Sequence, residues 1–145
     1  MRILALDHGT VRIGVAVSDE LQMIAQPLEY VPAEPFARFL ERLGQLIREK
    51  EVGLILVGLP RNMDGSHGAA AMKVREFIAR LSENLPAPIP IKPWDERLTS
   101  VMAHRALIQG QVRRADRKQK VDKTAAAILL QDYLDAQGAA MEHEA

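Results

Sequence analysis

The feature that most constrains the fold is a change in the spacing of apolar residues near Pro35. Before it, apolar residues gather in three short runs, at residues 2–7, 12–18 and 25–31. Runs of this length, separated by turn residues such as Gly9, predict β-strands, with the first two joined as a hairpin. The third run contains a proline, which suits a strand at the edge of a sheet.

After this point, helical and strand patterns alternate. Phe36, Phe39 and Leu43 recur at helical spacing, and Pro35 suits a first helical position. The patterns that follow predict a strand at 53–57, a Gly- and Asp-rich loop at 58–68, a helix over 74–85, a strand at 89–94, a helix from Thr99 to about 109 and a last helix over about 121–136.

This order of elements predicts a single α/β domain over residues 1–137, with a five-stranded mixed sheet flanked by helices. A chain of 145 residues suits one hydrophobic core, and no internal repeat divides it. Residues 138–145 are small and acidic without apolar periodicity, so we expect a disordered C-terminal tail.

Composition argues against several classes of protein. The chain has no cysteine, which removes a disulfide framework, a thiolate metal site and a thiol nucleophile. No stretch approaches the roughly 18 apolar residues that a membrane span needs, and we expect a cytoplasmic protein without a membrane partner. The 19 basic and 19 acidic side chains cancel, but basic residues are concentrated in 112–123, hereafter the basic stretch.

Two acidic residues follow predicted strands. Asp7 ends the first strand, at the carboxyl edge where α/β sheets place ligands. Glu96 follows the last strand, and the residues alone do not choose between it and Asp95 as a site residue. The structural alternatives are a turn cap for Asp7 and a first-turn acid for Glu96. His8 is next to Asp7, but strand alternation turns it to the other face, which favours a structural role.

A third acidic residue lies on the apolar face of the last predicted helix. Asp122 is in register with Ala126, Leu129 and Tyr133, so it faces the packed side of that helix. A carboxylate in this position must be paired, capped or bound to a metal. An N-terminal cap is the structural alternative.

Asp7, Asp122 and one of Asp95 and Glu96 can converge where the first and last strands meet the final helix. Oxygen ligands without cysteine favour Mg²⁺ or Mn²⁺, and a cation relieves the repulsion between three carboxylates. Two such metals about 3.5–4 Å apart can activate water and stabilise the leaving oxygen of a phosphodiester. The sequence therefore predicts a metal-dependent nuclease in which three such acids are the catalytic metal ligands.

Basic and polar residues near these acids are candidate substrate contacts. Arg12 and Arg97 can hold a phosphate through the planar guanidinium, and a salt bridge to Asp95 or Glu96 is the alternative for Arg97. The basic stretch can follow a nucleic-acid backbone or remain a solvated loop. The other candidates are Arg61 and Asn62 in the 58–68 loop, and Arg113, Arg114, Lys118 and Lys120 in the basic stretch.

Four motifs resemble those of the YqgF/RuvX family and come in the family's order. They are Asp7-His8-Gly9-Thr10 with residues 12–19, Gly-Leu-Pro-Arg-Asn-Met-Asp-Gly-Ser at 58–66, Asp-Glu-Arg-Leu-Thr-Ser at 95–100, and Lys-Val-Asp-Lys at 120–123 followed by the Ala-rich segment 125–131. The likeness runs over residues 2–136. The order of the motifs makes it specific, whereas Asp-x-Gly-Thr alone is a weak signal.

The resemblance implies an RNase H-like fold akin to Holliday-junction resolvases, and a nuclease that processes the 5′ end of the 16S ribosomal RNA precursor. It maps Asp7, Glu96 and Asp122 onto the family's metal-binding acids and makes Asp95 a neighbour. Precursor ribosomal RNA is then the expected partner, with the ribosomal subunit and branched DNA as further candidates. The sequence departs from the family's commonest form at Val11, Arg61, His67 and Pro93-Trp94, none of which is a candidate ligand.

Other functions remain open on the residues alone. A Holliday-junction-type DNA resolvase is a variant of the same chemistry, whereas a non-catalytic ribosome-assembly module would use the basic stretch for binding and make the acids structural. An actin-like ATPase would need a duplicated second domain, for which the chain has no repeat. The sequence does not fix the oligomeric state, the choice of metal or the position of cleavage.

Overall fold

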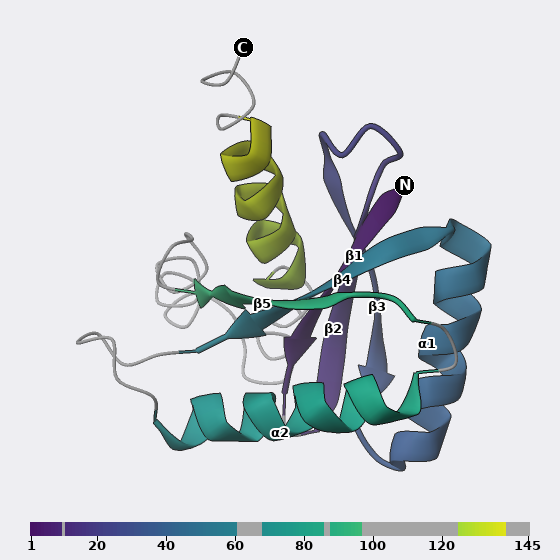
Figure 1. The fold of residues 1–145 in the computed structure, drawn as a ribbon, viewed down its shortest axis with the longest axis vertical. Coiled ribbons are helices and arrows are strands. Elements are labelled where there is room, and N and C mark those ends of the chain that lie inside the picture. The colour runs from purple at the N-terminus through teal and green to yellow at the C-terminus, as the bar shows by residue number, and fades with distance from the viewer. Residues whose placement is uncertain (10, 61–67, 86–87, 97–124, 139–145) are drawn as a thin grey trace, which may run out of the picture.

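The computed structural model describes residues 1–9, 11–60, 68–85, 88–96 and 125–138 (Figure 1). The strands are β1 Arg2–His8, β2 Arg12–Ser18, β3 Ala25–Pro32, β4 Val52–Leu59 and β5 Ile91–Asp95, and the helices are α1 Phe36–Lys50 and α2 Ala69–Asn84. The strands form one sheet in the order β3-β2-β1-β4-β5. β2 is antiparallel to β1 and β3, whereas β4 is parallel to β1 and β5.

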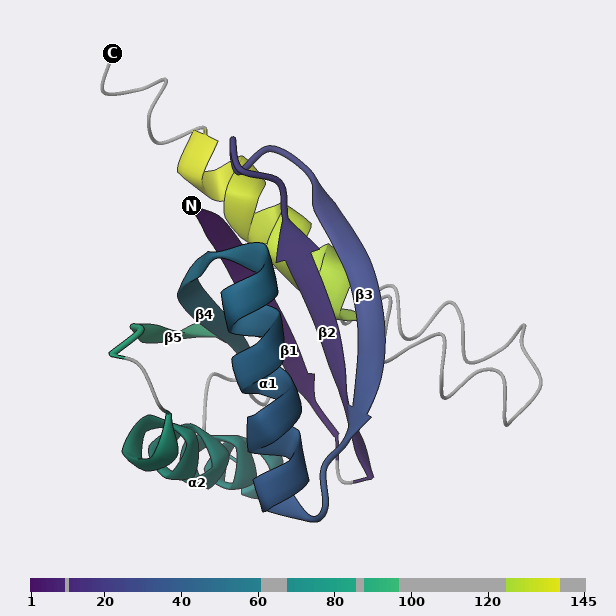
Figure 2. The same ribbon diagram turned by 90° about the vertical axis from the view of Figure 1, so that its right-hand side faces the viewer.

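Helices cover both faces of this sheet. α1 and α2 lie on one face, and the helical segment 125–138, hereafter the C-terminal helix, lies on the other (Figure 2). Leu4 and Leu6 of β1 pack with α1 and α2, whereas Ile3 and Ala5 pack with the C-terminal helix. Because both faces are covered, the central strands are apolar on both sides.

The predicted five-stranded mixed sheet flanked by helices is confirmed, with β1 and β2 as a hairpin and β3 at an edge. The helix expected from Thr99, the basic stretch and residues 139–145 lie outside the described residues. The proposed domain limits therefore stay a prediction. In the part of the chain that the structure describes, no helix is both long and apolar enough to cross a membrane.

Three predicted boundaries are wrong by a few residues. The strand predicted at 53–57 runs to Leu59, so Gly58 belongs to β4 rather than to the following loop. Pairing of Gly58 with Trp94 of β5 supplies the backbone hydrogen bonds that override the weak strand preference of glycine. Pro35 is the cap residue before α1 and not its first residue, and α2 begins at Ala69, ahead of the predicted span.

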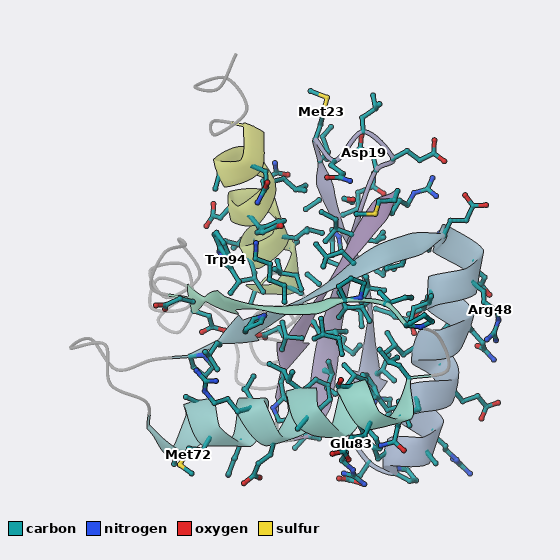
Figure 3. The ribbon with its side chains drawn as sticks, viewed as in Figure 1. Asp19, Met23, Arg48, Met72, Glu83 and Trp94 are labelled. Carbon is teal, nitrogen blue, oxygen red and sulfur yellow. The ribbon has the colours of Figure 1, made fainter. Side chains whose placement is uncertain are left out.

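Polar contacts tie the β2–β3 turn to the C-terminal helix, at the end of the sheet away from Asp7. The Asp19 carboxylate accepts hydrogen bonds from the backbone N–H groups of Met23 at 2.7 Å and Ile24 at 2.9 Å (Figure 3). The Gln131 amide accepts one from Ala25 at 2.8 Å and donates one to the Met23 carbonyl at 2.9 Å. These bonds fix the hairpin against the helix.

Candidate metal and nucleic-acid site

Asp7 lies near the end of β1, at the carboxyl edge of the sheet. It shares the face of Ile3 and Ala5, because alternate residues of a strand point to the same side, and this face is covered by the C-terminal helix. Only 4% of Asp7 is exposed. A carboxylate buried to this degree has lost most of its hydration, so its charged form requires donors or a cation nearby.

Glu96 follows β5 directly and is also only 4% exposed. Its side chain lies over Gly58, since a Cβ atom added to Gly58 would be 2.9 Å from Oε1 of Glu96. The same added atom would be 3.0 Å from Cδ2 of Leu129 in the C-terminal helix. The missing side chain of Gly58 therefore provides the space that the Glu96 carboxylate occupies beside this helix.

The register of the sheet brings Asp7 and Glu96 to one face. Leu6 of β1 pairs with Val57 of β4, so Asp7 and Gly58 occupy neighbouring positions one residue further along these parallel strands. Because Glu96 lies over Gly58, its carboxylate is one strand away from Asp7. The sequence predicted that the site acids come from the first and last strands, next to the final helix. In the sheet these two strands, β1 and β5, are not neighbours, because β4 lies between them.

The chemistry of these donors fits a hard divalent cation. Asp7 and Glu96 offer only carboxylate oxygens, the ligands that Mg²⁺ and Mn²⁺ prefer. The third predicted ligand, Asp122, lies outside the described residues. Within the described ranges, no three His, Cys, Asp or Glu side chains lie close enough to hold a metal ion. The described part of the chain thus contains two of the three residues predicted as ligands, and their role stays a prediction.

Arg12 begins β2 on the same face of the sheet as Asp7. Alternation places it with Gly14, the residue that pairs with Asp7 between the two strands. The guanidinium carbon of Arg12 lies 5.4 Å from the centre of the Tyr30 ring, a cation–π distance. This contact holds the guanidinium on the β3 side of Asp7, where it can approach a phosphate bound at the carboxyl edge.

His8 faces the opposite side of the sheet from Asp7, as strand alternation predicted. Its ring contacts Phe77 of α2, with 4.5 Å between the ring centroids. Burial lowers the pKa of the His8 imidazole below its ordinary value of 6.5, and the positive charge of Lys73 lowers it further. The imidazole is therefore neutral at pH 7 and packed away from the two carboxylates.

Sequence reasoning missed Gly58 as a site residue. The signal was present, because a glycine within a strand often marks the close approach of another group, but the residue had been assigned to a loop. Several predicted site residues lie outside the described residues, and their roles stay predictions: Asp122, Arg61, Asn62, Arg97, Arg113, Arg114, Lys118 and Lys120.

Comparison with known proteins identifies the family. The RuvX family, described as Holliday junction resolvase, matches residues 1–136. The "Putative pre-16S rRNA nuclease" of Desulforamulus reducens is 47% identical over 136 residues, which cover 94% of this chain and 98% of that protein. The protein of the same name from Halothermothrix orenii is 49% identical over 137 residues, covering 94% and 96%.

Solved structures confirm the fold. Thermus thermophilus RuvC in complex with a Holliday junction substrate superposes with a TM-score of 0.55 at 16% identity, over 94% of this chain and 95% of that chain. A second T. thermophilus RuvC structure gives a TM-score of 0.52 at 16% identity, over 96% and 97%. The predicted RNase H-like fold is thereby confirmed, and the names of the relatives confirm the nuclease prediction at the level of the family. The chain belongs to the RuvX family.

Proposed function

We propose that this chain is a divalent-metal-dependent endonuclease that processes the 5′ end of precursor 16S ribosomal RNA. The observation that supports the proposal is that two buried carboxylates, Asp7 and Glu96, lie on one face of the sheet, with Glu96 over Gly58 of the strand next to Asp7. Carboxylates at the carboxyl edge of a sheet suit a hard cation and a phosphate bound next to it. The names of the relatives supply the RNA substrate.

Asp7, Glu96 and Asp122 would hold Mg²⁺ or Mn²⁺ through their carboxylate oxygens. Bound divalent metal supplies activation of water and stabilisation of the leaving oxygen in phosphodiester hydrolysis. Burial of Asp7 and Glu96 restricts their side chains and excludes water, which strengthens their attraction for a cation. Mutual repulsion between the carboxylates further favours a cation between them.

Basic side chains would position the RNA strand. Arg12, held near Tyr30 on the face of Asp7, is suited to a phosphate adjacent to the cleaved bond. The basic stretch would follow the RNA backbone and make binding sensitive to salt. The proposed partners are precursor ribosomal RNA and the ribosomal subunit that contains it, and the proposed location is the cytoplasm. Arg61, Asn62, Arg97, Arg113, Arg114, Lys118 and Lys120 are the further proposed contacts.

The test is cleavage of a transcript that spans the mature 5′ end of 16S ribosomal RNA, with Mg²⁺ or Mn²⁺ present. Wild-type protein should produce one defined cut, and Asp7→Asn and Glu96→Gln should each slow it at least about a hundredfold. Glu83→Gln, which changes an exposed acid of α2, is the matched control and should cut normally. Equal cutting by wild type and Asp7→Asn would contradict the proposal.

Two further outcomes of this experiment separate the alternatives. RNA binding that survives a chelator, without cleavage under any metal condition, would favour a non-catalytic ribosome-assembly module. The description of the family as Holliday junction resolvase favours branched DNA as a second candidate substrate. A four-way DNA junction assayed in parallel tests it, and faster cleavage of the junction than of the RNA would replace the RNA assignment.

A further inference from the structure

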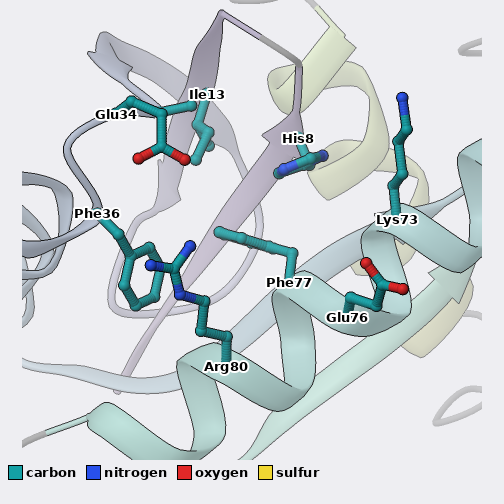
Figure 4. A pocket seen from close by; sticks show the side chains of 9 residues that line it. His8, Ile13, Glu34, Phe36, Lys73, Glu76, Phe77 and Arg80 are labelled. Atoms are coloured by element: carbon teal, nitrogen blue, oxygen red, sulfur yellow. The ribbon is translucent and has the colours of Figure 1, made fainter.

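A pocket of about 300 Å³ opens on the face of the sheet opposite to Asp7 (Figure 4). This volume is at the lower end of the range of small-molecule sites, about 300–1,000 Å³. The pocket lies where β1 ends and where β3 leads into α1, and α2 forms its other wall. His8 lines it, so only the end of β1 separates the pocket from the candidate metal site.

Four charged side chains line this pocket: Glu34 on one side, and Lys73, Glu76 and Arg80 on α2. The Glu34 carboxylate enters from the segment between β3 and α1, and the Arg80 guanidinium enters from α2 (Figure 4). Among the described residues, these two side chains form no ion pair. Arg80 instead lies over the ring of Phe36, with 3.9 Å from its guanidinium carbon to the ring centre. A hydrogen-bond acceptor and a donor fork are therefore both available to a ligand.

Aromatic rings form another wall of the pocket. Phe36 and Phe77 line it beside His8 (Figure 4), but both are buried, so they close the pocket with an apolar wall and offer no open ring face. Phe77 also packs on Phe39 of α1 with 5.7 Å between centroids, which fixes its position from behind. A base in this pocket would therefore be recognised by hydrogen bonds to its edges, one of the ways in which proteins read single-stranded nucleic acid.

We propose that this pocket binds a guanine base. Guanine has two adjacent donors, N1–H and the N2 amino group, which match the two oxygens of Glu34. It also has two adjacent acceptors, O6 and N7, which match the fork of Arg80. Adenine would place its N1 acceptor against the carboxylate, so the pocket discriminates against it. Lys73 also lines the pocket and supplies a cation for an attached phosphate.

Guanine can reach this pocket within an RNA strand or as a free nucleotide. The place of the pocket at the end of β1 favours RNA, because a strand with one phosphate near Asp7 can pass around this end and insert a neighbouring base. The inference that the guanine belongs to an RNA strand rests on the proposed nuclease function, whereas the inferred selectivity for guanine does not.

The first test is calorimetric titration of the metal-free full-length protein with GMP, IMP and AMP, which requires no cleavage. GMP should bind at least about tenfold more tightly than AMP. IMP, which lacks the 2-amino group, should bind with intermediate affinity. Equal affinities for GMP and AMP, or no GMP binding at millimolar concentrations, would overturn the proposal.

The second test replaces the acceptor. Glu34→Gln keeps the shape of the side chain but loses one acceptor oxygen, and it should weaken GMP binding at least about tenfold while leaving AMP binding nearly unchanged. Glu83→Gln on α2 is the control and should match wild type. If Glu34→Gln does not fold, Arg80→Lys is the alternative variant. It keeps the positive charge but loses the planar fork, and it should weaken GMP binding by the same factor. Wild-type GMP affinity in both variants would overturn the assignment.

A third experiment distinguishes RNA from a free nucleotide as the source of the guanine, and it distinguishes failure of the guanine pocket from failure of the nuclease function. Tighter binding of a pentaribonucleotide with one guanine than of GMP assigns the base to RNA, and equal binding assigns it to a free nucleotide. Guanine selectivity without RNA cleavage would support the guanine pocket and contradict the proposed nuclease function. RNA cleavage without guanine selectivity would contradict the guanine pocket but not the nuclease function.

Discussion

Gly58 and Glu96 are complementary in shape, because the glycine leaves open the volume that the glutamate carboxylate fills. A Cβ atom on Gly58 would be 2.9 Å from Oε1 of Glu96, closer than such atoms approach in proteins. Glu96 contributes one of the two buried carboxylates that carry the proposed function. The position of its oxygen therefore depends on a residue that has no side chain.

Gly58→Ala should displace the Glu96 carboxylate and reduce RNA cleavage at least about tenfold, since catalysis is sensitive to small misplacements. Overpacking should also cost about 1–3 kcal/mol of unfolding free energy. Cleavage rate and urea unfolding measure the two effects. Gly53→Ala in the same strand is the control, because the three atoms nearest to its added Cβ all belong to the flexible side chain of Met1. Wild-type cleavage by Gly58→Ala would show that this space is not needed.

The contact between Trp94 and Tyr133 links β5 to the C-terminal helix. The rings meet edge to face with 4.9 Å between centroids, two residues before Glu96. A double-mutant cycle with Trp94→Leu and Tyr133→Leu should give a coupling free energy of about 0.5–1.5 kcal/mol. Urea unfolding of the four proteins measures it by circular dichroism, since Trp94 is the only tryptophan. Additive effects of the two substitutions would show that the contact does not stabilise the fold.

Asp19 gives the β2–β3 turn a stability that depends on pH. The backbone N–H groups of Ile24 and Met23 lower the pKa of this carboxyl below its ordinary value of 3.8. Its contribution to stability is therefore complete above pH 3.8 and is lost as the pH falls through the lower folded-state pKa.

Asp19→Asn keeps an acceptor oxygen but removes the charge. Its midpoint of urea unfolding should lie below that of wild type at pH 7, and the difference should shrink toward pH 3. Cleavage should be unchanged, because the turn is at the end of the sheet away from Asp7. Glu83→Gln is the control for loss of one negative charge. A difference from wild type that stays constant with pH would contradict the assigned role of the carboxylate.

Much of the fold could be predicted because apolar spacing records how each element is buried. Ile3 and Ala5 pack on one side of β1 and Leu4 and Leu6 on the other, so the strand is apolar throughout its length. The alternation that placed Asp7 on one face also placed His8 on the other, and the structure confirms the placement of His8 against Phe77.

Local pattern did not reveal contacts that depend on the order of strands in the sheet. Gly58 was predicted to begin the Gly- and Asp-rich loop 58–68, but its pairing with Trp94 extends β4. The pairing of β4 between β1 and β5 then decides that Glu96 lies over Gly58, one strand away from Asp7. The pocket between Glu34 and Arg80 likewise joins segments far apart in sequence, and no local spacing predicts it.

Binding of Mn²⁺ tests the central claim most directly, because the claim is that Asp7 and Glu96 together hold a divalent cation. Paramagnetic resonance of free Mn²⁺ during titration, with a short RNA present, measures the bound fraction in wild type, Asp7→Asn, Glu96→Gln and the Glu83→Gln control. The account predicts saturable binding that Mg²⁺ displaces, weakened at least about tenfold in both site variants and unchanged in the control. Equal Mn²⁺ affinity in all four folded proteins would contradict it.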